Sequence, residues 1–358
     1  MKRRWLAVLV FLGGCAGGWA QDLILHRDLQ AVTATGTTAY AGAPSFRLRG
    51  IVLNDPEEML DGAYNPNAVA TTNIGGQYQL FIQSAATNDG GGTALWMGQN
   101  YQARGMLGEY YDAAAWSNEW MRATIATNGR AFRKGDLVEV LARNSLSYGG
   151  KRNVNEAHVT DPDFDFDVSL VQANVGLPQA TPLTLADLVA TGTNQIFDAA
   201  RQTGGERWQG ERVRLDGIRL ATTNGWGQTN WSQRLCWAAD AAGRGFPLRL
   251  PLKDLGAPPS TATYFSAVGI LNQESGGPVG TNGYELFVQE IQPEPELGRS
   301  GAGAVTLSFP ADYEGYVVEY SDDGLDSWQE LDATPKMTIV VEDPAAPPSR
   351  FYRLKWMP

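Results

Sequence analysis

The pattern Arg-Leu-x-Gly-Ile occurs twice in this chain, at residues 47–51 and 214–218. Each copy lies in a run where apolar and polar residues alternate, which is typical of a half-buried β-strand. Glycine inside a strand costs stability, so Gly50 and Gly217 indicate a bulge, a sharp bend or a close backbone approach. A small closed barrel needs a bent first strand, so the two copies predict two similar β units.

Further strands follow each copy, and their alternation is again that of β structure. An amphipathic pattern also predicts one helix over 104–124, between the third and fourth strands of the first unit. Tyr148-Gly149-Gly150 predicts a hairpin turn between the last two strands of that unit. The expected strands are 77–85, 93–98, 136–146 and 151–159 in the first unit, and 232–240, 246–251, 263–273 and 284–292 in the second.

Breaks rich in proline and glycine at 176–188 and 292–303 divide the chain. Together with a leader they predict four parts, and the last is a smaller β unit with a different pattern. The predicted parts are a signal peptide at 1–20, a first barrel domain at 21–180, a second at 181–297 and a tail at 298–358.

Several stretches carry a resemblance to known modules. RLRGIV (47–52), VRLDGI (213–218), LFIQ (80–83), KGDLVEV (134–140) and WQGERVRL (208–215) resemble OB-fold modules of secreted bacterial proteins, some of which accompany extracellular nucleases. GYVVEYSDDGLDSW (315–328) resembles the middle of a fibronectin type III domain, although the tail is too short for a complete one. The resemblance implies a mainly β protein with two OB-fold-like five-stranded barrels and a small C-terminal β-sandwich.

The first residues have the layout of a secretory signal: a basic start, an apolar run and small residues before Gln21. We therefore expect a mature N-terminus at Gln21. An alternative remains, because Leu12-Gly13-Gly14-Cys15 resembles a lipobox in which Cys15 would be lipidated. Both alternatives predict export to a secreted, periplasmic or cell-surface location, and the apolar run is too short to predict a transmembrane helix.

Cysteine and charge usage narrow the function classes. If Cys15 is removed or lipidated, Cys236 has no partner for an intrachain disulfide and is expected to be a buried apolar residue. The net charge is −11, and three of the basic residues lie in the leader. A non-specific polyanion binder is expected to carry a basic excess, so this class is disfavoured, although a local basic groove stays open.

No catalytic constellation is present in the sequence. The two histidines, His26 and His158, form no zinc motif, and neither a nucleophile elbow nor a phosphate-binding glycine loop occurs. We expect His158 to be a structural residue. The prediction is therefore a protein that is not an enzyme and that has no cofactor.

An acidic cluster is the one place where a metal is considered. Asp163, Asp165 and Asp167 alternate, so in a strand they would share one face and could hold calcium. An EF-hand counted from Asp163 would need glycine at its sixth position and glutamate at its twelfth, where Val168 and Asn174 stand. The alternative is an edge strand whose charges face water.

Aromatic residues indicate where a ligand could bind. Trp226, Trp231 and Trp237 cluster around the loop between the first and second strands of the second unit, where OB-folds bind ligands. Exposed aromatic rings stack on bases, and in the same way on sugars. Trp231 and Trp237 could instead share a core face, whereas Trp226, between two glycines, is expected to face a ligand. In the first unit the corresponding candidates are Tyr148, Lys151 and Arg152.

These observations predict an exported, non-catalytic binding or scaffold protein for an extracellular glycan or nucleic acid. The alternative is an accessory or degenerate part of an extracellular hydrolase or nuclease system. The sequence leaves the ligand and the oligomeric state open.

Overall fold

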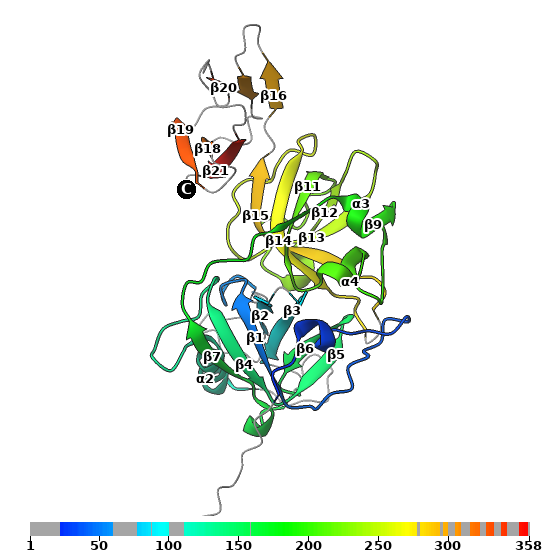
Figure 1. The fold of residues 1–358 in the computed structure, drawn as a ribbon, viewed down its shortest axis with the longest axis vertical. Coiled ribbons are helices and arrows are strands. Elements are labelled where there is room, and N and C mark those ends of the chain that lie inside the picture. Colours follow the sequence, from blue (N-terminus) through cyan, green and yellow to red (C-terminus); the bar gives the residue numbers. More distant parts are fainter. Residues whose placement is uncertain are drawn as a thin grey trace, which may run out of the picture.

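A computed structural model of the chain describes residues 22–59, 77–86, 88–99, 111–157, 159–277, 280–293, 296–299, 305–308, 316–322, 327–332, 338–341 and 351–356. The predicted fold class is confirmed, because the protein is mainly β with two five-stranded barrels and a small C-terminal sandwich. Figure 1 shows the two barrels stacked along the long axis and the tail beyond the second one.

The second barrel closes through hydrogen bonds between all neighbouring strands. The strand order is β11-β12-β13-β15-β14 and back to β11, with every pairing antiparallel except β13 with β15. This Greek-key order is that of an OB-fold. The short strand β8 (Thr181–Leu183) adds to β11 in parallel. The barrel strands are β11 (Arg212–Leu220), β12 (Leu235–Ala239), β13 (Gly245–Arg249), β14 (Phe265–Gln273) and β15 (Tyr284–Pro293).

The first strand of this barrel bends as its sequence predicts. Val213 and Leu215 are fully buried in the barrel core, and Arg214 between them is half-buried. Gly217 has a φ of +66°, and the register with β14 shifts between Leu215 and Ile218. A left-handed residue at a register shift is a β-bulge, so the predicted bend is confirmed.

The first barrel has the same connectivity, with one strand in two pieces. Here β1 pairs with β2 and β4, β3 pairs in parallel with β6, and β6 pairs with β5. The predicted strand 136–146 breaks at residues 143–144, so β4 and β5 together take the fourth position. The strands are β1 (Phe46–Val52), β2 (Gln77–Gln83), β3 (Gly92–Gly98), β4 (Leu137–Ala142), β5 (Ser145–Tyr148) and β6 (Lys151–Asn155).

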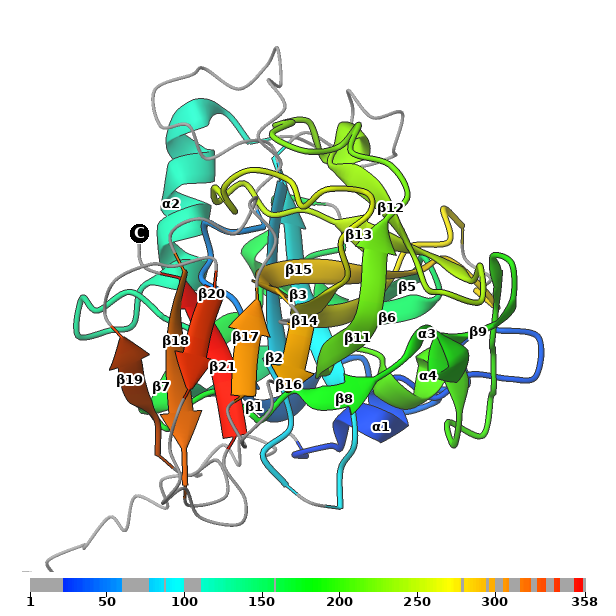
Figure 2. The same ribbon diagram turned by 90° about the horizontal axis from the view of Figure 1, so that it is seen from above.

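The helix between the third and fourth strands is α2 (Ala113–Thr124). Asp112 caps it, because its side chain accepts a hydrogen bond from the backbone N–H of Ala115 at 2.8 Å. The predicted start at 104 lies outside the described residues. Viewed from above, α2 flanks one side of the barrels, and α3 (Leu185–Leu188) and α4 (Gly204–Trp208) flank the other (Figure 2).

Several short elements were not predicted. They are α1 (His26–Leu29), η2 (Pro162–Phe164), β7 (Asp167–Gln172), α3 (Leu185–Leu188), β9 (Val189–Thr191), β10 (Asn194–Gln195), α4 (Gly204–Trp208) and η3 (Trp231–Gln233). Among them, β7 forms an edge of the first sheet beside β4.

The described segments of the tail form two three-stranded sheets, ordered β16-β17-β20 and β19-β18-β21. Val318 on β18 is buried and belongs to the same hydrophobic cluster as the core of the second barrel, and Leu331 packs against that cluster. The strands are β16 (Glu296–Arg299), β17 (Val305–Ser308), β18 (Tyr316–Ser321), β19 (Gln329–Asp332), β20 (Thr338–Val341) and β21 (Phe351–Trp356).

The barrels have separate cores, and a third apolar cluster joins them. Phe81 and Ala94 of the first unit pack with Ile270 and Phe287 of the second. The rings of Phe81 and Phe287 meet edge to face at 5.8 Å. Within the described residues, no helix is long and apolar enough to cross a membrane.

Candidate functional site

The face that OB-folds use for ligands is covered in the first barrel. That face is formed by the second and third strands, here β2 and β3. Phe81 on β2 and Ala94 on β3 are buried against the second barrel, where Ile270 and Phe287 meet them. At the rim, the side-chain amide of Gln289 donates to the carbonyl of Leu53 at 2.6 Å. This surface of the first barrel is therefore occupied by the second barrel.

The final hairpins of the two barrels also meet. The backbone N–H of Gly149 donates to Gly277 O at 2.7 Å, and that of Ser275 donates to Gly149 O at 2.9 Å. Lys151 is 5% exposed, and its ammonium donates to acceptors on the second barrel. These acceptors are Asn272 Oδ1 at 2.8 Å, Gln273 O at 3.0 Å and Glu274 Oε2 at 2.9 Å.

The predicted ligand-binding residues Tyr148, Lys151 and Arg152 therefore lie at or beside the junction where the final hairpins of the two barrels meet. Lys151 is buried there, and Tyr148 is exposed with its hydroxyl 3.4 Å from Gly276 O. The guanidinium of Arg152 lies over the ring of Tyr40 and donates to Ser145 Oγ at 2.7 Å. None of the three lines the pocket of the second barrel.

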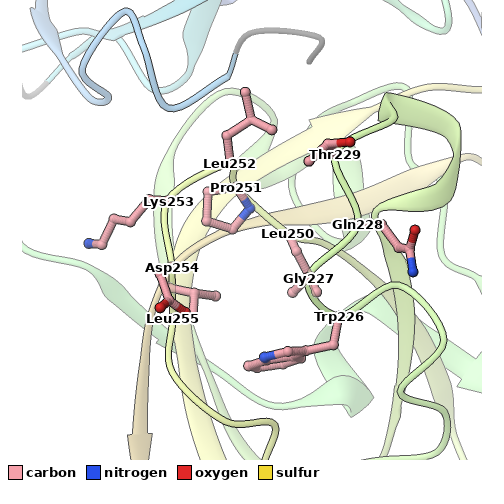
Figure 3. A pocket seen from close by; sticks show the side chains of 10 residues that line it. All are labelled: Trp226, Gly227, Gln228, Thr229, Leu250, Pro251, Leu252, Lys253, Asp254 and Leu255. Carbon is pink, nitrogen blue, oxygen red and sulfur yellow. The ribbon is translucent and has the colours of Figure 1, made fainter. Parts of the chain in front are cut away.

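That pocket lies where the loop between β11 and β12 meets the segment after β13. It has a volume of about 230 Å³. Figure 3 shows Trp226 and Leu255 at one side of the opening and Leu252 and Thr229 at the other. The loop between the first and second strands is a ligand-binding region of OB-folds, so the pocket stands where the sequence places one.

Trp226 is held in place by the fold. Its indole Nε1–H donates to Gly256 O at 2.7 Å, and its ring packs half-buried against the barrel core. The sequence predicts that Trp226 faces a ligand rather than the core. In the structure its side chain does both, because it lines the pocket and also packs against the core of the second barrel. Trp231 opens η3, and its side chain lies outside the described residues. Trp237 is half-buried on β12 and does not line this pocket.

Polar groups in the pocket suit uncharged hydroxyl-bearing ligands. Gln228 and Thr229 are exposed and carry amide and hydroxyl groups. Lys253 and Asp254 give one charge of each sign, and the Lys253 ammonium lies 3.4 Å from Gln289 O. The lining therefore has apolar and polar groups without an excess of positive charge.

The three aspartates proposed to share a strand face are separated. The residues 162–164 form the 3₁₀ turn η2 with Asp163 exposed, and β7 begins only at Asp167. Asp167 accepts from Arg143 Nη2 at 2.6 Å. The interpretation of one strand carrying all three is wrong, because Pro162 and the Asp161 cap, whose side chain accepts from the N–H of Asp163, start a turn there.

Asp165 instead belongs to a different carboxylate group. Glu119 of α2, Glu156 and Asp165 each offer an oxygen, and these oxygens lie within 4.8 Å of one another. Arg122 offsets their charge, with Nη2 2.7 Å from Glu119 Oε2 and Nε 3.5 Å from Asp165 Oδ2. Burial, reinforced by Glu119 and Asp167 and opposed by Arg122 and Arg143, raises the pKa of Asp165 to about 6. Three carboxylates could hold a cation, but an arginine already pairs with two of them.

The remaining candidate residues have structural surroundings. His26 is buried, with Nδ1 2.9 Å from Thr93 Oγ1, and burial lowers its pKa. Cys236 is a buried free cysteine in the core of the second barrel, and burial raises its pKa. His158, Cys15 and the leader lie outside the described residues.

The fold and the pocket define a mainly β protein built on two barrels, one of which carries an open loop-lined pocket. Compared with known proteins, the chain matches no family model and no curated protein.

Proposed function

We propose that this chain is an exported, non-catalytic binding protein that takes a neutral sugar unit of a glycan in the Trp226 pocket. The proposal rests on a difference between the two barrels in which ligand-binding surfaces are open to solvent. The β2–β3 face of the first barrel is buried against the second barrel. The last hairpin of the second barrel contacts Gly149, whereas its first loop, among the described residues, lines an open pocket.

The chemistry of this pocket favours a sugar over a nucleic acid. A strand of nucleic acid would need several cationic groups along a groove. Among the described lining residues Lys253 is the one cation, and Asp254 stands next to it. Sugars present apolar C–H faces to aromatic rings and hydroxyls to amides, and Trp226, Gln228 and Thr229 provide these groups. The volume of about 230 Å³ is below the roughly 300–1,000 Å³ of pockets for drug-sized ligands, so it suits one sugar unit.

The remaining architecture supports a binding or scaffold role. The shared strand order of the two units supports the resemblance to tandem OB-fold modules. In the described part of the tail, the orders β16-β17-β20 and β19-β18-β21 match the two sheets of a fibronectin type III domain without its last strand, which supports that resemblance. The leader sequence supports export.

A binding screen of the mature protein tests the proposal. Neutral oligosaccharides and single-stranded oligonucleotides are offered in parallel, and calorimetry follows for any hit. We expect a neutral glycan to bind and Trp226→Phe to weaken its binding. Tyr264→Ala is the matched control, since Tyr264 is an exposed aromatic residue of the same barrel outside the pocket lining. Binding of oligonucleotides alone, or glycan binding that Trp226→Phe leaves unchanged, would overturn the proposal.

A further inference from the structure

A larger cavity of about 590 Å³ lies between the two barrels. The first unit contributes Arg27 and Asp28 of α1 and, from the end of β2 and the turn after it, Gln83, Ser84, Ala86 and residues 88–91. The second unit contributes Ala200, Arg201, Arg207 and Glu211. Most of the lining side chains are polar or charged, in contrast to the Trp226 pocket. No residue of this cavity lines the Trp226 pocket, so the inference does not depend on the proposed function.

The cavity has equal numbers of formal charges, but two of its three carboxylates, Asp89 and Glu211, already accept backbone hydrogen bonds. Asp89 accepts the backbone N–H groups of His26 and Arg27, both at 3.0 Å. Asp28 lies 3.8 Å from Arg27. Glu211 accepts the backbone N–H of Gly91. Burial raises its pKa, and the positive charges of Arg207 and Arg201 oppose this rise, so Glu211 holds a negative charge less readily than an ordinary glutamate.

Two guanidinium groups have unused donors at the cavity. Arg207 is exposed, and in the part of the chain that the structure describes it makes no ion pair within 4.0 Å. Its guanidinium lies 4.6 Å from the centre of the Trp208 ring, which orients it by a cation–π contact. Its Nη1 stands 3.8 Å from the point where a Cβ on Gly90 would lie, so it is close to the glycine turn.

Arg201 is the second guanidinium group that lines the cavity, and it is more buried than Arg207. Its Nη1 donates to Glu206 and to the carbonyl of Gln30, both at 3.2 Å, whereas its buried Nη2 has no hydrogen-bond partner among the described residues. That Nη2 stands 3.2 Å from the point where a Cβ on Gly91 would lie. The backbone of Arg201 has a φ of +56°, a costly conformation for arginine. Strain and an orphan donor beside a cavity are typical of functional sites.

We propose that this cavity binds a small acidic sugar, with Arg207 donating to its carboxylate or phosphate and Arg201 adding positive potential from the wall. Guanidinium groups match the planar arrangement of such oxyanions. Gln83, Ser84 and Asn88 line the same cavity and can exchange hydrogen bonds with hydroxyl groups. Gly90 and Gly91 let a ligand approach the backbone closely, because they have no side chains.

The carboxylate and the phosphate are distinguished by choice of probe. Calorimetry on the mature full chain would use D-glucuronate, glucose 6-phosphate and, as the neutral control, glucose. We expect at least one acidic sugar to bind about tenfold or more tightly than glucose, and Arg207→Gln to weaken that binding by about tenfold or more, the usual effect of losing a hydrogen bond from a charged group. Trp226→Phe should leave it unchanged, which separates this site from the other pocket.

A substitution that fills the cavity provides the second test. Gly90 is outside the left-handed region, and a Cβ there would be in ordinary contact with Glu211 Oε1 at 3.5 Å, so Gly90→Trp attaches a ring at the cavity wall without backbone strain. It should abolish binding without lowering the melting temperature. Gly277→Trp is the matched control, because a Cβ on Gly277 has no neighbour within 4 Å. The proposal is overturned if neither acidic sugar binds more tightly than glucose, or if both Arg207→Gln and Gly90→Trp leave binding unchanged.

Discussion

Gly92 and Gly210 face each other across the junction of the two barrels. A Cβ on Gly92 would stand 2.1 Å from the carbonyl oxygen of Gly210, and a Cβ on Gly210 would stand 2.5 Å from the carbonyl carbon of Gly92. The backbone N–H of Gly92 also donates to Gln209 O at 3.2 Å. The two backbones therefore touch where β3 begins and where the chain enters β11, and any side chain at either position would force them apart.

Replacing Gly92 with alanine should push the two backbones apart and destabilise the protein. Gly92 is not in the left-handed region, so the cost comes from steric overlap rather than from backbone conformation. Overpacking of a tight contact typically costs about 1–3 kcal/mol, which denaturant unfolding would measure. Gly277→Ala is the control and should change stability by less than about 0.5 kcal/mol. Equal stability of the two variants would show that the barrels can move apart freely.

Leu215 should behave as a core residue of the bent first strand. It is fully buried, so Leu215→Ala should lower the free energy of unfolding by about 2–5 kcal/mol. Its neighbour Arg214 is partly exposed and pairs with Asp216 at 2.7 Å, so Arg214→Gln should cost no more than about 1 kcal/mol. Similar losses for both variants would contradict the inward and outward alternation of this strand.

Asp165 should make stability depend on pH between about 4 and 6. Its pKa is about 6 in the folded protein against an ordinary 3.8, so the folded state binds the proton more tightly than the unfolded state does. The stabilisation from this proton is complete below pH 3.8 and is lost as the pH rises through 6. At 1.36 kcal/mol per pKa unit, this difference in pKa limits the contribution of Asp165 to the pH-dependent change in unfolding free energy to about 3 kcal/mol.

The variant Asp165→Asn isolates this effect. It carries no titrating group, so it should be more stable than the parent protein at pH 7, and the difference should vanish below about pH 4. Asp163→Asn changes an exposed carboxylate of the neighbouring turn and should leave the profile unaltered. Thermal unfolding over this pH range measures both, and a parent protein that gains stability relative to Asp165→Asn as pH rises would refute the assignment.

The barrel strands could be predicted because burial alternates along them. Leu48 and Val213 mark buried positions at period two. Gly217 marks a bulge, whereas Gly50 marks a close backbone approach, because a Cβ there would stand 2.8 Å from Gln83 O. The break between β4 and β5 could not be predicted, because Arg143 and Asn144 interrupt the strand only when its two halves pair with different neighbours. Alternating aspartates at 163–167 suggested a strand, but local turn chemistry at Pro162 prevailed there.

The candidate sites differ in how far the sequence could reveal them. Trp226 could be predicted as a ligand-binding residue, because it stands between two glycines in the loop between the first and second barrel strands, which OB-folds use to bind ligands. The cavity at Arg207 could not be predicted, because its walls come from the turn after β2 and from residues more than a hundred positions later. The sequence predicts that Lys151 faces a ligand, but the packing of the two barrels gives its ammonium Asn272 and Glu274 as partners.

The tail should stabilise the second barrel. Val318 is buried in the same apolar cluster as residues such as Leu286, so removing 294–358 should expose part of this cluster. We expect a chain of residues 21–293 to remain folded, with a melting temperature several degrees lower, as a loss of about 1–2 kcal/mol would produce. Val318→Ala in the full chain should also lower the melting temperature. An unchanged melting temperature in both proteins would show that the tail is energetically independent.

Trp226 should contribute to both stability and binding, and two substitutions separate the contributions. Trp226→Phe keeps an aromatic face but loses the Nε1 hydrogen bond to Gly256, so it should cost about 0.5–1.5 kcal/mol of stability. Trp226→Ala also removes the packing against the core and should cost more than Trp226→Phe. For a neutral sugar, loss of the stacking face should weaken binding by about 1–3 kcal/mol in Trp226→Ala, by analogy with stacked bases, and by less in Trp226→Phe. Calorimetry well below the melting temperature of each variant measures binding on folded protein. If Trp226→Ala loses stability while its sugar affinity equals that of Tyr264→Ala, the ring is a core residue and the pocket does not use it.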